Sequence, residues 1–164
     1  MSRANLRLVS IHDYIIDHRG FDWPSLLREW TWLMPPAFTV WIMNRFGDLF
    51  VVLEDGGVHM LDVGAGTLTK VAENRGDFET KMDEDDNANQ WLMIPLINRL
   101  VSQGIALANG QCYSYKRPPV LGGDYTVENV FVLPIAQHYG AYGSIHKQIK
   151  DLPDGTEVVF KATD

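Results

Sequence analysis

The chain has 164 residues and a net charge of −7, with 46% apolar and 21% charged residues. These values are typical of a folded globular protein and exclude a largely disordered chain. A single cysteine, Cys112, excludes an internal disulfide framework and a cysteine-rich zinc site, and is typical of a reducing compartment. The longest apolar runs are too short to cross a bilayer, and the first residues carry arginines without the apolar core of a secretion signal. We therefore expect a cytoplasmic protein that does not span a membrane.

The spacing of apolar residues changes from helical to strand-like and back again along the chain. We expect one domain over residues 1–164, with a helical N-terminal segment at 1–36 and a core of sheet and helices at 37–164. The predicted fold class is α+β, with a central antiparallel meander flanked by helices.

Two helices are predicted between residues 11 and 34, separated at Gly20. Asp22 is the expected N-cap of the second helix, with Pro24 in its first turn. The residues of its apolar face expected to be buried are Trp23, Leu27 and Trp30.

The middle of the chain is rich in β-branched and aromatic residues in short runs, which predicts strands. The Asp55-Gly56-Gly57 turn between two such runs is a strong hairpin signal, because glycine adopts positive φ without steric cost. The predicted strands are 38–44, 48–53, 58–62 and 67–72.

The rest of the chain is predicted to alternate between helices and strands. Apolar residues four apart predict a helix at 88–103, which either kinks at Pro95 or becomes regular only near Ile94. The other predicted elements are a short helix at 74–82, strands at 111–115 and 127–133, a helix at 142–152 and an edge strand at 157–161.

The negative charge is concentrated in residues 77–90, which sum to −5. Four consecutive acids form the centre of this stretch: Asp83, Glu84, Asp85 and Asp86. Such a stretch repels nucleic acids and anionic lipids and attracts a basic protein, although it also suits a solvated loop. We take these four residues as the candidate partner-binding site.

Tests for catalytic and cofactor motifs are negative. Cys112 could pair with His138 or His146 as a nucleophile and base, but a lone cysteine in a strand is more often a buried core residue. The Asp83-x-Asp85-x-Asn87 start of a calcium loop has Ala88 where the loop needs glycine. We expect no catalytic residues, metal or cofactor, and no nucleic-acid binding, because a basic footprint is missing.

Several short motifs occur in a characteristic order. They are Phe46-Gly47-Asp48-Leu49-Phe50, Glu54-Asp55-Gly56-Gly57-Val58, Gly110-Gln111-Cys112-Tyr113, Pro118-Pro119-Val120-Leu121-Gly122-Gly123, Asn129 and Leu152-Pro153-Asp154-Gly155-Thr156. Together they resemble a bacterial family that includes the C-terminal domain of immunity proteins paired with type VI secretion DNase effectors, often with a GAD-like segment upstream. The resemblance implies a cytoplasmic protein that binds a toxin nuclease, and it supplies no catalytic residue. It also implies a structural role for the glycines, and Asn129 is expected to hydrogen-bond a loop backbone.

Two functions remain open from the sequence. The first is a non-catalytic immunity protein that binds a basic toxin through the acidic stretch. The second is a small-molecule-binding or enzymatic domain with a pocket lined by its aromatic residues, namely Trp23, Trp30, Trp32, Trp41, Trp91, Tyr113 and Tyr115.

Overall fold

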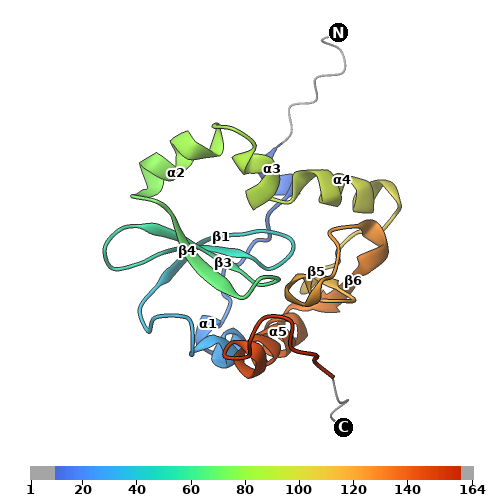
Figure 1. Cartoon of the computed structure of the whole chain (residues 1–164). Helices are drawn as coiled ribbons and strands as arrows, with labels where there is room; N and C mark the ends of the chain where they lie inside the picture. The colour runs from blue at the N-terminus through green and yellow to red at the C-terminus, as the bar shows by residue number, and fades with distance from the viewer. Residues whose placement is uncertain (1–9, 160–164) are drawn as a thin grey trace.

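The structure is a computed structural model that describes residues 10–159, and it is built around a four-stranded antiparallel sheet (Figure 1). The strands follow one another in the order β1-β2-β3-β4, and each is antiparallel to the next. They are β1 (Thr39–Met43), β2 (Leu49–Val52), β3 (Val58–Asp62) and β4 (Thr67–Ala72). The predicted meander and the α+β class are confirmed.

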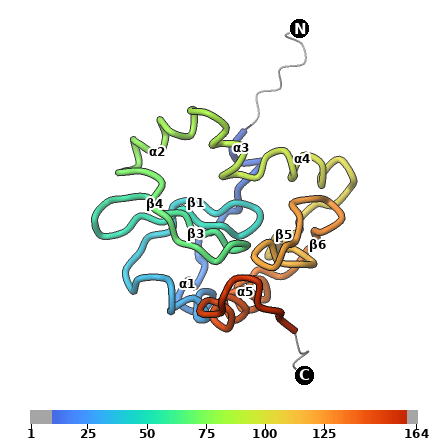
Figure 2. The backbone as a smooth tube through the Cα atoms, viewed as in Figure 1, coloured from blue at the N-terminus to red at the C-terminus, as the bar shows by residue number. Residues whose placement is uncertain are grey.

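Helices lie on both sides of this sheet, and a second, smaller sheet stands beside it (Figure 1). From β4 the chain passes through α2 (Arg75–Met82), α3 (Asn87–Trp91) and α4 (Ile94–Ser102) along one side of the sheet (Figure 2). The second sheet pairs β5 (Gln111–Tyr115) with β6 (Val130–Pro134) in antiparallel fashion. On the other side of the main sheet lie α1 (Trp23–Leu26) and α5 (Ile135–Ile149).

Aromatic side chains hold α2 and α3 on the sheet. Phe78 of α2 is buried and stacks on Trp91 of α3, with ring centroids 5.0 Å apart. The same Phe78 ring lies 5.1 Å from both Trp41 of β1 and Phe50 of β2. Buried aromatic pairs of this kind add to the stabilisation from area burial alone, so this cluster fixes the helical layer over the sheet.

The N-terminal helices are shorter than predicted. The first is reduced to a 3₁₀ turn at Ile11–Asp13, and the prediction of a helix up to Gly20 was wrong. The chain is extended after this turn because the Ile16 N–H donates to the carbonyl of Met43, and Ile15 forms a β-bridge with Asn44. This pairing with the sheet satisfies backbone groups that a helix would otherwise pair internally.

The second N-terminal helix forms in two pieces, α1 and a 3₁₀ turn at Arg28–Trp30. Asp22 caps α1 as predicted, because its carboxylate accepts a hydrogen bond from the Ser25 N–H. Trp30 is fully buried and Leu27 is buried, whereas Trp23 is only partly buried. The predicted burial is therefore confirmed for Leu27 and Trp30, whereas Trp23 is less buried than predicted.

The predicted helix at 88–103 is split at Met93, whose φ of +55° ends α3 and starts α4. Pro95 then lies in the first turn of α4, where the missing N–H has no cost, so the second predicted alternative is correct.

Two boundaries in the last third of the chain differ from prediction. The final helix begins at Ile135 rather than at 142, and the strand predicted from 127 starts at Val130 after a 3₁₀ turn. No strand forms at 157–159, and the remainder of the predicted edge strand, 160 and 161, lies outside the described residues.

Candidate partner-binding surface

The loop between α2 and α3 carries the four acidic residues predicted as a partner-binding site, and all four are exposed. We call this segment, Asp83, Glu84, Asp85 and Asp86, the acidic loop. Within residues 10–159 none of its carboxylates takes part in an ion pair, and the neighbouring Lys81 instead pairs with Asp77 at 3.1 Å. The structure therefore places four uncompensated negative charges together on the surface.

Two asparagine side chains form hydrogen bonds at the two ends of the acidic loop. The Asn87 side chain donates to the carbonyl of Lys81 at 2.8 Å, and the Asn89 side chain donates to the carboxylate of Asp86 at 2.7 Å. Asp85 has a φ of +50°, which aspartate tolerates better than most residues. The loop is therefore a structured turn at the start of α3.

A pocket of about 410 Å³ is lined by residues from just before β2, from β3, from α3 and α4, and from β5 of the second sheet. Its polar lining consists of Asp48, Asp62, Asn89, Gln90, Arg99, Tyr115 and Tyr125, and its apolar lining of Met60, Met93, Pro95 and Leu96. We call this cavity the acidic pocket. Asn89 connects it to the acidic loop, since the same side chain lines the pocket and binds Asp86.

The register of β2 and β3 brings two carboxyl groups of the acidic pocket together. Leu49 pairs with Leu61, and continuing this register by one residue sets Asp48 opposite Asp62. Asp48 is only 4% exposed, and its two oxygens accept hydrogen bonds at 2.9 Å from the Val63 N–H and the Asn44 side chain. Burial, reinforced by the charge of Asp62, raises the pKa of Asp48 to about 8.

Two tyrosines and one arginine complete the acidic pocket. The Tyr115 ring meets the Tyr125 ring edge to face, with centroids 5.6 Å apart. Tyr115 is 5% exposed, whereas Tyr125 is 48% exposed. Arg99 is exposed, and it forms no ion pair within the described part of the chain. The pocket thus combines buried and accessible groups, with aromatic rings beside carboxyl groups.

The two buried histidines of α5 bind backbone rather than forming a catalytic pair. Burial lowers the pKa of His138 to about 4, so the ring is neutral at physiological pH. Its Nε2–H donates to the Phe46 carbonyl at 2.8 Å, and its Nδ1 therefore accepts from the Ser114 hydroxyl at 2.8 Å. His146 likewise donates from Nε2 to the carbonyl of Val63 at 2.7 Å.

Cys112 is fully buried, and burial raises the pKa of its thiol to about 12. A thiol in that state is a poor nucleophile, because the thiolate is the reactive form. The arrangement therefore does not favour the cysteine–histidine chemistry considered from the sequence.

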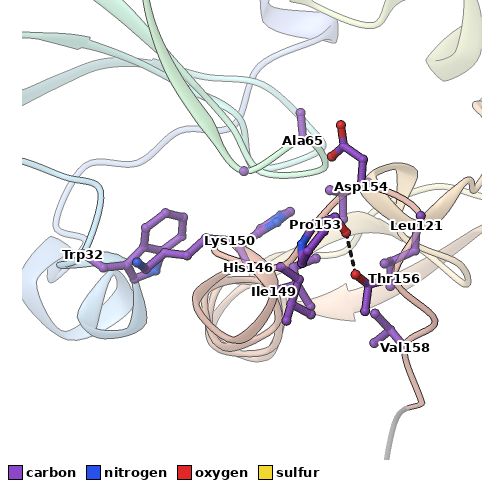
Figure 3. A pocket seen from close by; sticks show the side chains of 14 residues that line it. Trp32, Ala65, Leu121, His146, Ile149, Lys150, Pro153, Asp154, Thr156 and Val158 are labelled. Atoms are coloured by element: carbon purple, nitrogen blue, oxygen red, sulfur yellow. Dashed lines mark hydrogen bonds between the residues drawn. The ribbon is translucent and has the colours of Figure 1, made fainter.

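A groove beside α5 gathers two of the sequence motifs (Figure 3). Val120 and Leu121 line one part of the groove and the segment 152–156 another, and the lining is completed by Trp32, by His146 of α5 and by the Ala65–Gly66 turn. A hydrogen bond of 2.6 Å from the Thr156 hydroxyl to the Pro153 carbonyl shapes the 152–156 turn. Among the residues that line the groove, the charged side chains are Lys150 and Asp154.

The aromatic residues predicted as a possible pocket lining are mostly core residues. Trp30 and Tyr113 are fully buried, and Trp41 and Trp91 belong to the cluster around Phe78. Only Trp32 and Tyr115 line the cavities described above.

The predicted backbone role of Asn129 is confirmed. Its side-chain oxygen accepts from the Arg117 N–H, and its amide donates to the carbonyls of Arg117 and Asp124. Gly123 sits against the same loop, where a Cβ would lie 1.8 Å from the Arg117 oxygen, so no other residue fits there.

Between residues 10 and 159, no three histidine, cysteine or acidic side chains come close enough together to bind a metal ion. Over the same range, no helix has both the length and the apolar character needed to cross a membrane.

Comparison with known proteins supports the resemblance inferred from the sequence. Residues 72–146 match the family model described as "T6SS immunity protein Tdi1, C-terminal", and this confirms the resemblance over those residues. No curated protein sequence matches the chain. Among solved structures, the crystal structure of Atu4351 from Agrobacterium tumefaciens is similar with a TM-score of 0.46 and 22% identity. That alignment covers 74% of this chain and 60% of the other, so this chain spans 60% of the length of Atu4351.

Proposed function

We propose that this protein is an immunity protein that binds and blocks a basic nuclease toxin of a type VI secretion system. One observation carries the proposal. The segment that matches the immunity-protein family, residues 72–146, contains the acidic loop, whose four charges are exposed and free of ion pairs within residues 10–159. The protein would act by occupying the toxin and would catalyse no reaction.

Charge supports this choice of partner. A nuclease must hold a polyanion, so its DNA-binding surface is positively charged. The acidic loop and the acidic pocket are joined through Asn89, and together they offer a negative surface complementary to such a partner. The same charges disfavour nucleic acid and anionic membranes as ligands, because both are negatively charged themselves.

The proposed location is the cytoplasm, where the toxin would reach the DNA of the cell. The single reduced cysteine, Cys112, agrees with that compartment. The buried histidines His138 and His146 are engaged with backbone carbonyls, in keeping with a role that needs no general acid or base.

The test uses the nuclease toxin that this proposal requires, sought first among the genes adjacent to this one, then purified and assayed for cleavage of plasmid DNA. We expect added protein to abolish cleavage, with the inhibition complete at a one-to-one molar ratio and a stable complex by gel filtration. Inhibition at far below equimolar amounts would contradict the non-catalytic mechanism, and the absence of both complex and inhibition would reject the immunity function.

A further inference from the structure

We propose that the acidic pocket is a receptor for the guanidinium group of an arginine side chain presented by the protein partner. The identity of that partner rests on the proposed function, whereas the chemistry of the pocket rests on its own residues. Four features of the pocket favour this ligand.

The first feature is an uncompensated pair of carboxyl groups. No lysine, arginine or histidine of residues 10–159 lies within 4.0 Å of the Asp48 or Asp62 carboxylate. Burial and the charge of Asp62 keep Asp48 largely protonated at neutral pH, so the pair carries about one negative charge. A cation that enters the pocket would favour the ionised form of Asp48 and would then face two carboxylates.

The second feature is a tyrosine hydroxyl group without a hydrogen-bond partner. Tyr115 is only 5% exposed, and its hydroxyl oxygen, which solvent reaches, makes no hydrogen bond with residues 10–159. Tyr115 lines the pocket together with Asp48 and Asp62, and burial, followed by the charges of these two acids, raises its pKa. The hydroxyl is therefore available to accept an N–H from a ligand in the pocket.

The third feature is the accessible ring of Tyr125. Its ring lies at 85° to the ring of Tyr115, and the residue is 48% exposed, so a ligand that enters the pocket can reach it. A guanidinium group over the face of this ring gains a cation–π interaction while its N–H groups remain free for the carboxylates.

The fourth feature is the arrangement of free acceptors, which suits a planar, branched donor. One oxygen of Asp62 accepts from the Ala65 N–H at 3.0 Å, and the other has no partner within residues 10–159. Arginine presents five N–H donors in a fixed fork and keeps its charge when buried, whereas lysine loses its proton more readily. Arginine therefore matches the pocket better than lysine.

Arg99 is the charge in the pocket that opposes this ligand. It is exposed and unpaired within the described residues, so it can lean toward the carboxyl groups and compete with an incoming guanidinium. Removing its charge should leave ligand binding intact or strengthen it.

The experiment titrates the isotopically labelled full chain with N-acetyl-arginine amide while amide and tyrosine NMR signals are recorded. N-acetyl-citrulline amide is the matched probe, because it has nearly the same shape without the charge. We expect saturable shifts centred on Tyr115, Tyr125 and Asp62, and binding of the citrulline probe at least tenfold weaker. Equal binding of the two probes, or shifts centred on the acidic loop, would overturn the proposal.

Variants separate the pocket from general attraction by negative charge. Asp62→Asn should weaken the arginine probe at least tenfold while keeping the bond to the Ala65 N–H. Asp124→Asn removes a neighbouring exposed acid that does not line the pocket, and it should leave the affinity unchanged. Tyr125→Phe should bind like the native protein and Tyr125→Ala more weakly, whereas Arg99→Gln should bind at least as tightly. Equal losses in Asp62→Asn and Asp124→Asn would reduce the effect to long-range attraction and reject the pocket.

The inference and the proposed function can fail separately. The probe titration requires no toxin. If the arginine probe binds and the toxin does not, the pocket is retained as an arginine-binding site and the immunity function is rejected. If the toxin binds Asp62→Asn and the native protein with equal affinity, the immunity function stands and the pocket is not where the partner is anchored.

Discussion

The hydroxyl of Tyr139 donates a 2.6 Å hydrogen bond to the carbonyl of Gly47, which joins α5 to the turn between β1 and β2. Gly47 has a φ of +81°, and a Cβ at this position would lie 3.0 Å from the Cδ2 atom of His138. Both the backbone conformation and the close approach of α5 therefore require glycine here. Without it, the helix could not pack this closely on the turn that leads to Asp48.

Gly47→Ala should be clearly destabilising, and Gly104→Ala provides the matched control. Gly104 has a φ of +80° and no atom within 4 Å of a Cβ, so alanine there costs only the left-handed backbone, about 1–2 kcal/mol. At Gly47 the contact with His138 adds about 1–3 kcal/mol of overpacking. Free energies of unfolding from urea titrations measure the difference. Equal losses in the two variants would show that α5 can shift to make room.

Trp30 should be one of the strongest contributors to stability. Its side chain is fully buried, and its Nε1–H donates to the Tyr139 carbonyl at 2.9 Å. Trp30→Ala should cost about 3–5 kcal/mol through the cavity that it leaves. Trp30→Phe keeps most of the ring and should cost less, mainly the lost hydrogen bond of about 1–2 kcal/mol. A melting temperature for Trp30→Ala equal to that of the native protein would contradict this account.

The four strands of the meander could be predicted because their signals are local. Each strand is a short β-branched or aromatic run, and the Asp55-Gly56-Gly57 turn fixes how two of them meet. The N-terminal helix was mispredicted from the helical spacing of Ile11, Tyr14, Ile15 and His18. In the structure the chain at Ile15 and Ile16 pairs with the edge of the sheet instead. That competition is between distant segments, so periodicity alone could not reveal it.

The acidic loop could be predicted because its charges are consecutive, whereas the acidic pocket is assembled from distant parts of the chain. One part of the pocket was nevertheless accessible from the sequence. Pairing the predicted strands across the Asp55-Gly56-Gly57 turn sets Asp48 opposite Asp62, an unfavourable pair that suggests a functional reason. The approach of Tyr115 and Tyr125 depends on the second sheet and carried no comparable signal.

Stability should be greatest near pH 6.5. The pKa of Asp48 is raised in the folded state from 3.8 to about 8, so its contribution is full below about pH 4 and is lost progressively as pH rises to 8. The pKa of His138 is lowered to about 4 and that of His146 is also lowered, so their contributions are lost as pH falls below 6.5. Between pH 6.5 and 8 only Asp48 acts, and it should reduce the free energy of unfolding by about 2 kcal/mol.

Asp48→Asn is the variant that tests this assignment. It should abolish the decline between pH 6.5 and 8 and should steepen the loss on acidification, because between about pH 4 and 6.5 the contribution of Asp48 opposes that of the histidines. Urea unfolding at three pH values for the native and variant proteins gives the slopes, and comparing slopes removes the constant cost of the substitution. A decline of equal size in both proteins would assign it to another group.

The acidic loop should govern how fast the partner is bound rather than how stable the protein is. At physiological salt, exposed charges further apart than about 8 Å are largely screened, so their effect appears as an association rate that falls with added salt. Neutralising Asp83, Glu84, Asp85 and Asp86 with asparagine or glutamine should slow association and flatten its salt dependence. Asparagine also tolerates the positive φ of Asp85, and exposed charges contribute little to folding, so the variant should unfold like the native protein.

A control variant that neutralises four exposed acids outside the loop, Glu54, Asp151, Asp154 and Glu157, changes the net charge equally. Stopped-flow association with the toxin identified by its inhibition at several salt concentrations compares the two variants. If the loop faces the toxin, its variant should have the slower rate and the flatter slope, because steering depends on where the charges lie and not only on their sum. Equal rates in both variants would assign the effect to net charge, and an unchanged rate in the loop variant would make the acidic loop a solvated turn.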